Sequence, residues 1–239
     1  MPTRAPRKKR LEPRKKPIQR RSQATVDAIL QAAARVFATS GYARTTTNHI
    51  ARRAGVSIGS LYEYFPSKDA ILVALTERHV DEAERTLAAE LAAVRASRLP
   101  LPDVVRRLVD VMVALHARDP GLHRVLFEEA PLPPRLRARV TALEQAMASE
   151  VAKLLEEHGV PPAEAPIAAR LAAEVLESLT HRLVVHDDAA PRAAASPNST
   201  FEQQAQEMTL LVTSYLAAKR TGSTGARTGA RRGDVRVFT

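Results

Sequence analysis

Helical periodicity is the feature that most constrains how this chain can fold. Between residues 22 and 219, apolar side chains recur at spacings of three and four, which places them on one face of successive helices. The first such stripe consists of Val26, Ile29, Leu30, Ala33, Val36 and Phe37. No segment of the sequence shows a convincing alternation of apolar and polar residues, the pattern of a half-buried strand. The sequence therefore predicts an all-α fold.

Capping residues and prolines divide this pattern into about nine helices. Ser22, Ser57 and Ser67 are suited to cap the starts of helices, whereas Gly41 and Gly55 are suited to end them. Later prolines fall at helix ends or in first turns, where proline is tolerated. The predicted helices cover residues 22–40, 48–54, 58–64, 68–96, 102–117, 121–129, 134–158, 162–186 and 201–219.

The formal net charge of +10 is concentrated at the two ends of the chain. Residues 1–21 carry a net charge of +9 and residues 219–239 a net charge of +5, so the sequence between them is near −4. Such segments cannot bury enough apolar surface to fold, and we predict a disordered basic arm over 1–21 and a flexible basic tail over 220–239. A low-complexity loop is predicted over 187–200. The arm is either a DNA-contacting segment or a solubilising leader or misassigned start.

Composition excludes several classes of protein. The 239 residues contain no cysteine, which excludes disulfide frameworks, thiolate metal sites and cysteine nucleophiles and favours a reducing compartment. No stretch approaches the roughly 18 apolar residues of a membrane span, and no apolar segment of a secretory signal follows the basic start. We expect a cytoplasmic protein that has no membrane partner.

The segment with the clearest functional pattern runs from Thr46 to Lys68. A short helix, a glycine-containing turn and a second short helix have the layout of a helix-turn-helix. Small residues at the start of the second helix would allow close entry into a DNA major groove, while Leu61 and Phe65 could anchor that helix to the core. An ordinary helical hairpin with a polar outer face fits the same spacing, so the pattern alone leaves both readings open.

Residues 41–75, GYARTTTNHIARRAGVSIGSLYEYFPSKDAILVAL, together with the preceding ILQAAARVF helix, closely resemble the TetR family of bacterial transcriptional regulators (TetR/AcrR type). The most specific features are AGVS in the turn and the Leu-Tyr-x-Tyr-Phe-x-x-Lys run that ends at Lys68. The resemblance is strong over residues 22–75, and beyond them only the helical plan and the length match. It implies a three-helix DNA-binding domain over 22–66 and a larger helical ligand-binding and dimerisation domain over 67–219.

The resemblance also implies which side chains contact DNA. Asn48, Ile58 and Ser60 would lie near base edges, and Gly59 would permit close approach. For Ile58, a core position fits the spacing as well as contact with a thymine methyl group does. Arg44, Arg52 and Arg53 could contact phosphates or form a solvated face, and His49 is interpreted as a surface residue. The predicted DNA-binding residues, including the phosphate-binding Thr47, Tyr62, Tyr64 and Lys68, are Thr46, Thr47, Asn48, Ser57, Ile58, Gly59, Ser60, Tyr62, Tyr64 and Lys68.

A homodimer is expected, because one recognition helix contacts too few base pairs for specificity. The last two predicted helices each carry an apolar stripe, and the resemblance implies that they pack as a four-helix bundle with those of a second copy. The alternative is that both stripes close the core of the monomer. The predicted interface residues are Leu171, Val175, Leu179, Leu183, Met208, Leu211, Val212 and Tyr215.

The resemblance further implies a small-molecule effector that binds the C-terminal domain and releases DNA. Five side chains could face such a pocket, although a Met or Phe on a helix face is more often a core residue and a lone His more often a satisfied or surface one: His79, Met112, His116, His123 and Phe127. Five of the nine aromatic residues precede residue 66, and this scarcity of stacking platforms in the C-terminal domain favours an aliphatic ligand over a planar one.

No enzyme motif is recognisable. The sequence contains no HExxH, no paired Glu-x-x-His, no nucleophile elbow and no phosphate-binding loop. We therefore predict no catalytic residue, no metal site and no cofactor. The predicted function is a ligand-responsive repressor that binds a palindromic operator as a homodimer, and the alternative is a sequence-independent architectural DNA-binding protein.

Overall fold

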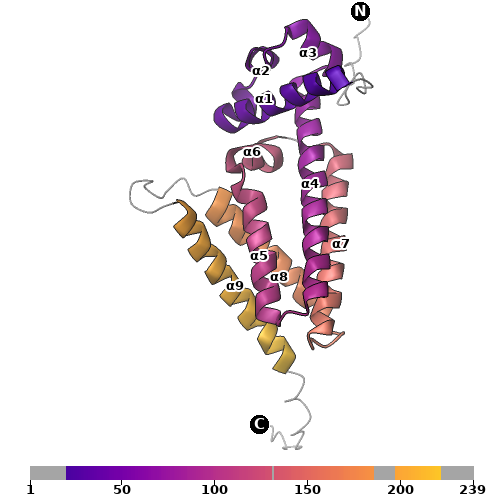
Figure 1. Cartoon of the computed structure of the whole chain (residues 1–239), viewed down its shortest axis with the longest axis vertical. Coiled ribbons are helices and arrows are strands. Elements are labelled where there is room, and N and C mark those ends of the chain that lie inside the picture. Colours follow the sequence, from indigo (N-terminus) through magenta and orange to yellow (C-terminus); the bar gives the residue numbers. More distant parts are fainter. Residues whose placement is uncertain (1–19, 131, 186–196, 222–239) are drawn as a thin grey trace, which may run out of the picture.

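The computed structural model describes residues 20–130, 132–185 and 197–221. Over these residues the chain forms nine α-helices, two π-helical segments and no strand, so the all-α prediction is confirmed (Figure 1). The elements are α1 (Arg20–Arg44), α2 (Thr47–Ala54), α3 (Ile58–Tyr64), α4 (Lys68–Ser97), α5 (Leu101–Ala117), α6 (Pro120–Arg124), η1 (Val125–Glu129), α7 (Pro134–Glu157), α8 (Ala165–Thr180), η2 (His181–Val185) and α9 (Pro197–Thr221).

Two predicted helices differ from the observed ones. The expected helix over 121–129 is divided into α6 and the π-helical η1, and the expected helix over 162–186 begins at Ala165 and ends in the π-helical η2. The predicted loop over 187–200 is too long, because α9 already begins at Pro197, a residue whose fixed φ suits the first turn of a helix. The predicted arm over 1–21 and tail over 220–239 lie almost entirely outside the described residues.

The first three helices form a small bundle at one end of the molecule, above the long helix α4 (Figure 1). Phe37, Ile50, Leu61 and Phe65 are fully buried between them. Local capping sets the ends of the short helices: the hydroxyl of Ser57 accepts a hydrogen bond from the N–H of Ser60 at 3.0 Å. The core of this bundle is shared with the first turns of α4 and with η1.

The predicted break at Gly41 is present inside α1. Gly41 has φ 70° and ψ 172°, which kinks the helix before its last turn. A Cβ at this position would lie 2.9 Å from Oε2 of Glu129, and the N–H of Tyr42 donates to the same oxygen at 2.8 Å. The kink therefore lets the end of α1 contact η1 directly.

The remaining helices form the larger part of the molecule. In Figure 1, α4 runs from the three-helix bundle along the length of the molecule beside α7. Helices α5, α8 and α9 complete this larger part. Alanines at positions 165, 168, 169 and 172 are buried on α8, and their small side chains allow its neighbours to approach closely. None of the described helices is both long enough and apolar enough to cross a membrane.

Helix α6 connects the two parts of the molecule through a close contact at Gly121. A Cβ built on Gly121 would lie 2.9 Å from the carbonyl oxygen of Ala38 on α1. We expect Gly121→Ala to lower the free energy of unfolding by about 1–3 kcal/mol, because a backbone atom cannot move aside as a side chain can. Urea denaturation followed by circular dichroism measures the change.

Gly59→Ala is the matched control for this substitution. Its Cβ would meet only the Ser57 hydroxyl at 3.7 Å, and alanine favours a helix more than glycine does. We therefore expect Gly59→Ala to leave the stability unchanged or to increase it. A Gly121→Ala protein as stable as the Gly59→Ala protein would show that the contact between α1 and α6 is not tight.

Candidate nucleic-acid interface and histidine cluster

The first turn of α3 is an exposed part of the helix-turn-helix. Ser57, Ile58 and Gly59 are exposed, whereas Leu61, two to four residues later, is fully buried. Ile58 is 38% exposed, so the structure favours the surface reading of this residue over the core reading. The small side chains around Gly59 leave the backbone of this turn accessible.

The start of α2 lies beside this turn and adds polar groups. Thr46 and Asn48 are exposed, and the Thr46 hydroxyl accepts a hydrogen bond from the N–H of His49 at 3.2 Å. The hydroxyls of Thr47 and Tyr62 lie 3.0 Å apart, which joins the two helices at their surface. The structure therefore brings the predicted residues of α2 and α3 together on one polar edge.

Two of the predicted phosphate-binding residues have additional roles. Tyr64 is half-buried and packs against the core of the bundle. The ammonium group of Lys68 lies 2.7 Å from the carbonyl oxygen of Tyr42 and 3.1 Å from that of Thr45, and it sits over the Tyr42 ring at 4.2 Å from its centroid. In the structure Lys68 thus holds the end of α1, and a phosphate contact would have to share its donors.

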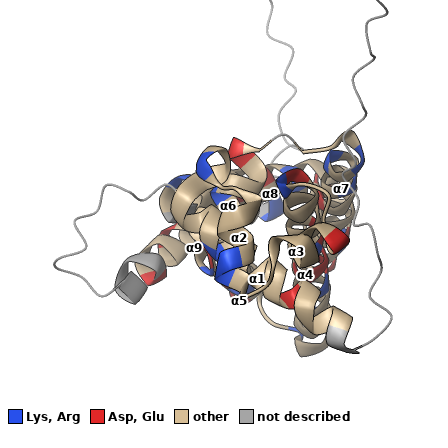
Figure 2. Ribbon diagram, turned by 90° about the horizontal axis from the view of Figure 1, so that it is seen from above, with Lys and Arg blue, Asp and Glu red and all other residues tan. Residues whose placement is uncertain are grey.

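Helix α3 contains no Lys or Arg, and its one charged residue is the exposed Glu63. Figure 2, seen from the end that carries α1–α3, shows only short basic stretches there, and most of the ribbon of α2 and α3 carries neither charge. Arg52 and Arg53 are exposed on α2, and the Arg44 side chain donates to the carbonyl of Ser40 at 3.0 Å. Any sequence readout by α3 would therefore use hydroxyl and apolar groups or the Glu63 carboxylate, and no cationic side chain.

Comparison with known families identifies this arrangement. Residues 29–75 match the model of the bacterial regulatory proteins of the tetR family, and residues 100–216 match the model of the tetracyclin repressor-like C-terminal domain. The chain belongs to the TetR family. It is accordingly a DNA-binding regulator with a helix-turn-helix, as the resemblance at residues 41–75 predicts, and its relatives are regulators rather than enzymes.

Individual relatives agree with this assignment. The chain is 31% identical over 155 residues to the nucleoid occlusion factor SlmA of Vibrio campbellii, covering 63% of this chain and 77% of that protein. A TetR-family transcriptional regulator from Mesorhizobium loti has a similar fold, with a TM-score of 0.65 and 17% identity over 84% of this chain and 98% of that one. The regulator FadR of Bacillus subtilis, solved in complex with stearoyl-CoA, matches with a TM-score of 0.55 and 19% identity over 82% and 98% of the two chains.

The predicted interface residues of the TetR-family C-terminal domain divide into three groups by exposure. Leu171, Val175 and Leu211 are exposed, while Leu179, Leu183 and Tyr215 are partly buried against the core of their own chain. Met208 and Val212 are 1% and 4% exposed, so their assignment to an interface is wrong. They lie on the side of α9 that faces the core, and the exposed side carries Leu210 and Leu211 instead. Ile167, which the sequence reading missed, extends the exposed row on α8.

A cleft of about 320 Å³ lies between α1, α4, α5 and α6. His79 and His123, two of the predicted pocket residues, line it, and the Phe127 ring packs on both. Met112 is not among its lining residues. The lining also carries five charged side chains, which does not fit the expected aliphatic ligand: Arg35, Arg78, Glu82, Arg118 and Asp119.

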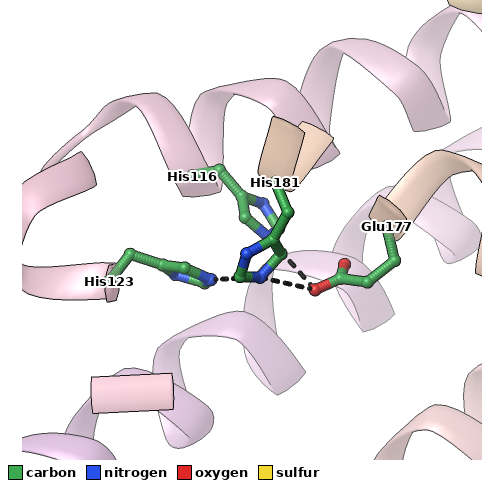
Figure 3. A group of neighbouring side chains, drawn as sticks. All are labelled: His116, His123, Glu177 and His181. Atoms are coloured by element: carbon green, nitrogen blue, oxygen red, sulfur yellow. Dashed lines mark hydrogen bonds and ion pairs between the residues drawn. The ribbon is translucent and has the colours of Figure 1, made fainter. Parts of the chain in front are cut away.

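Next to this cleft, four ionisable side chains converge. We refer to them as the histidine cluster, and they are His116, His123, Glu177 and His181 (Figure 3). Both Nε2 of His116 and Nε2 of His181 lie 3.3 Å from Oε1 of Glu177, and Nε2 of His123 lies 3.0 Å from Nε2 of His181. His116 and His123 are buried, and Glu177 and His181 are half-buried.

Burial and mutual contacts perturb the pKa values in the cluster. Burial, reinforced by the neighbouring histidines, lowers the pKa of His123 to about 2. The hydrogen bond to Glu177 raises the pKa of His181 against the effect of burial. Burial alone would raise the pKa of Glu177, but hydrogen bonds from His116 and His181 outweigh it and hold that pKa below its usual range. The cluster thus combines a neutral imidazole with an ionised carboxylate.

The sequence reading found only half of the histidine cluster. His116 and His123 are among the predicted pocket residues, whereas Glu177 and His181 are not. A signal for the missing pair exists, because Glu177 and His181 are four residues apart and therefore share one side of a helix. The spacing Glu-x-x-x-His differs by one residue from the Glu-x-x-His pattern sought in the sequence.

Proposed function

We propose that this TetR-family regulator is a ligand-responsive transcriptional repressor that binds a palindromic operator as a homodimer and is released by a small-molecule effector. The observation that carries the DNA-binding part is the first turn of α3, in which Ile58 and Gly59 are exposed, on a helix that the contact between the Thr47 and Tyr62 hydroxyls joins to the polar start of α2. A short helix end with small side chains suits entry into a major groove.

The dimer is supported by the exposed apolar row on α8. Ile167, Leu171 and Val175 are spaced by four residues and therefore lie on one side of the helix, and Leu210 and Leu211 are exposed on α9. An uncovered apolar surface of this kind is typical of an interface between subunits. A two-fold axis through it would present two recognition helices to the two halves of a palindrome.

Ligand response is supported by the neighbours and by the connections in this chain. FadR of Bacillus subtilis was solved with stearoyl-CoA, so a protein of this fold accommodates a small molecule. In this chain α4 begins in the DNA-binding bundle and continues through the C-terminal domain, and the cleft near His79 lies between α1 and that domain. A ligand there that favours one position of α4 would change the separation of the recognition helices.

The test is selection of duplexes from a random-sequence pool by the full-length protein at physiological salt. The proposal predicts an enriched inverted repeat whose half-sites face the same side of the duplex, about one helical turn or a multiple of it apart. Enrichment without any shared sequence would instead support the architectural alternative, in which binding is sequence-independent.

Ser60 provides a sharper prediction about readout. Replacing Ser60 with valine should change the preference at one base pair by about 1–3 kcal/mol, because the hydroxyl of this half-buried residue, which lies 2.9 Å from that of Ser57, would face a base edge. Thr47→Val is the control, since a phosphate contact should affect all sequences similarly. Competition binding with a set of single-base variants of the selected duplex measures both effects. Equal losses on every duplex for the Ser60 variant would disprove its reader role.

A further inference from the structure

We propose that the histidine cluster is a binding site for a divalent first-row transition-metal ion, with zinc preferred. Three imidazoles and one carboxylate form a donor set that zinc uses commonly, and imidazole also suits Ni²⁺ and Co²⁺. This assignment departs from the expectation of no metal site, which the sequence alone suggested.

The spacing of the donor atoms fits tetrahedral coordination. One donor atom from each of the four side chains lies within 4.8 Å of all the others. Zinc–nitrogen distances of about 2.0–2.1 Å place tetrahedral ligands roughly 3.3 Å apart. Three separations in the cluster are already 3.0–3.3 Å, so small side-chain rotations would complete the site.

Neighbouring acceptors orient two of the imidazoles. Nδ1 of His116 donates to the carbonyl oxygen of Met112 at 2.8 Å, and Nδ1 of His181 lies 3.1 Å from Oε1 of Glu128. Each contact fixes the proton on Nδ1 and leaves Nε2 directed into the cluster. Metal-binding histidines in proteins are typically held in this way.

A divalent ion also explains how so many donors can face one carboxylate. With Nδ1 of His116 and of His181 both used as donors, a hydrogen bond from either Nε2 to Glu177 needs a second proton on that ring. A divalent cation supplies the two positive charges that these extra protons would bring. It would also accept electron pairs from Nε2 of His116, of His181 and of His123 together.

The local fold is built around this cluster. His181 is the first residue of η2 and Glu128 lies in η1, so the two π-helical segments of the described chain meet here. Such segments are frequent at functional sites because they redirect side chains within a helix. Glu177 is only half-buried, which leaves an entry path for an ion.

Helix α6 and the following η1 connect the histidine cluster to the DNA-binding bundle. His123 lies two residues after Gly121, which packs against α1, and Glu128 precedes Glu129, which accepts the Tyr42 N–H. A metal ion that draws α6 and η1 toward α8 would act on both contacts with α1. We therefore infer, resting on the proposed function, that occupation of the site changes the affinity for DNA by at least about fivefold.

The test of the site uses the full-length protein, without a polyhistidine tag, and Co²⁺ as a spectroscopic probe. We expect one Co²⁺ per chain with the strong visible absorption of tetrahedral coordination, displaced by Zn²⁺. In Glu177→Gln the affinity should fall by at least about 100-fold, as expected for loss of a ligand rather than of an outer contact. Glu174→Gln, which removes an exposed carboxylate one turn earlier on α8, should bind like the wild type.

Each outcome decides a different part of the proposal. Absence of tetrahedral Co²⁺ in the wild-type protein overturns the metal site, and so does equal binding by the Glu177→Gln and Glu174→Gln proteins. The His181→Ala protein provides a second loss-of-ligand measurement if Glu177→Gln changes the fold by circular dichroism. If Co²⁺ binds but Zn²⁺ leaves the affinity for the selected duplex unchanged, the regulatory link falls and the site stands. If no duplex is selected at all, the proposed function fails while the metal titration remains decisive.

Discussion

Replacing Leu171 with glutamate should convert the protein from a dimer to a monomer and lower its affinity for a two-half-site duplex by at least about 100-fold. Leu171 is 40% exposed in the middle of the apolar row on α8, between Ile167 and Val175. In a symmetric dimer, the new carboxylate of one subunit would face the same carboxylate of the other. Both groups would be desolvated on association, which opposes dimerisation. The loss of the second recognition helix then removes the gain in affinity from simultaneous binding to both half-sites.

Sedimentation at micromolar concentration and fluorescence anisotropy with the selected duplex measure these two changes. Ala89→Glu adds the same charge at an exposed position of α4 and should leave both the mass and the affinity as in the wild type. A Leu171→Glu protein that sediments like the wild type would refute the interface. A wild-type protein that sediments only as a 26.1 kDa monomer would refute the dimer itself.

Truncation of Phe65 should have the largest effect on stability. Phe65 is 1% exposed, ends α3 and packs in the core that α1, α2 and α4 share. Phe65→Ala should lower the free energy of unfolding by about 3–5 kcal/mol, because it leaves a cavity as well as removing buried apolar surface. Since Phe65 holds α3 in place, binding of the selected duplex should also weaken strongly.

Tyr62→Ala separates these two effects. Tyr62 is 41% exposed and its hydroxyl contacts Thr47, so its removal should reduce DNA affinity with little change in stability. Urea denaturation followed by circular dichroism, together with anisotropy, distinguishes the two variants. If Phe65→Ala unfolded within about 1 kcal/mol of the wild type, the core assignment of Phe65 would be incorrect.

The DNA-binding bundle could be predicted closely because its signals are local. Ser57 caps α3 and Gly55 ends α2 in the left-handed conformation, both within a few residues of the helices they bound. The fully buried Leu61 and Phe65 follow from their spacing on a single helix face. The environments of Tyr64 and Lys68 were not predicted: Tyr64 packs against the core, and the carbonyl partners of Lys68 are 23 to 26 residues away in the sequence.

The C-terminal domain was less predictable because its key contacts are distant in the sequence. Periodicity identifies an apolar stripe on α9, yet it does not tell whether that stripe faces the core or a second copy, and Met208 and Val212 face the core. Similarly, the four residues of the histidine cluster come from α5, α6, α8 and η2. No single helix reveals that these side chains meet.

We expect a dimer of this TetR-family protein to recognise two half-sites through α3. The most direct measurement is the affinity of the full-length protein, at physiological salt, for three duplexes: the selected inverted repeat, the same duplex with one half-site scrambled, and one with both scrambled. We predict that the intact repeat binds at least about 10³-fold more tightly than the fully scrambled duplex. The half-scrambled duplex should bind far more weakly than the intact one. Equal affinities for all three duplexes would contradict recognition of two half-sites.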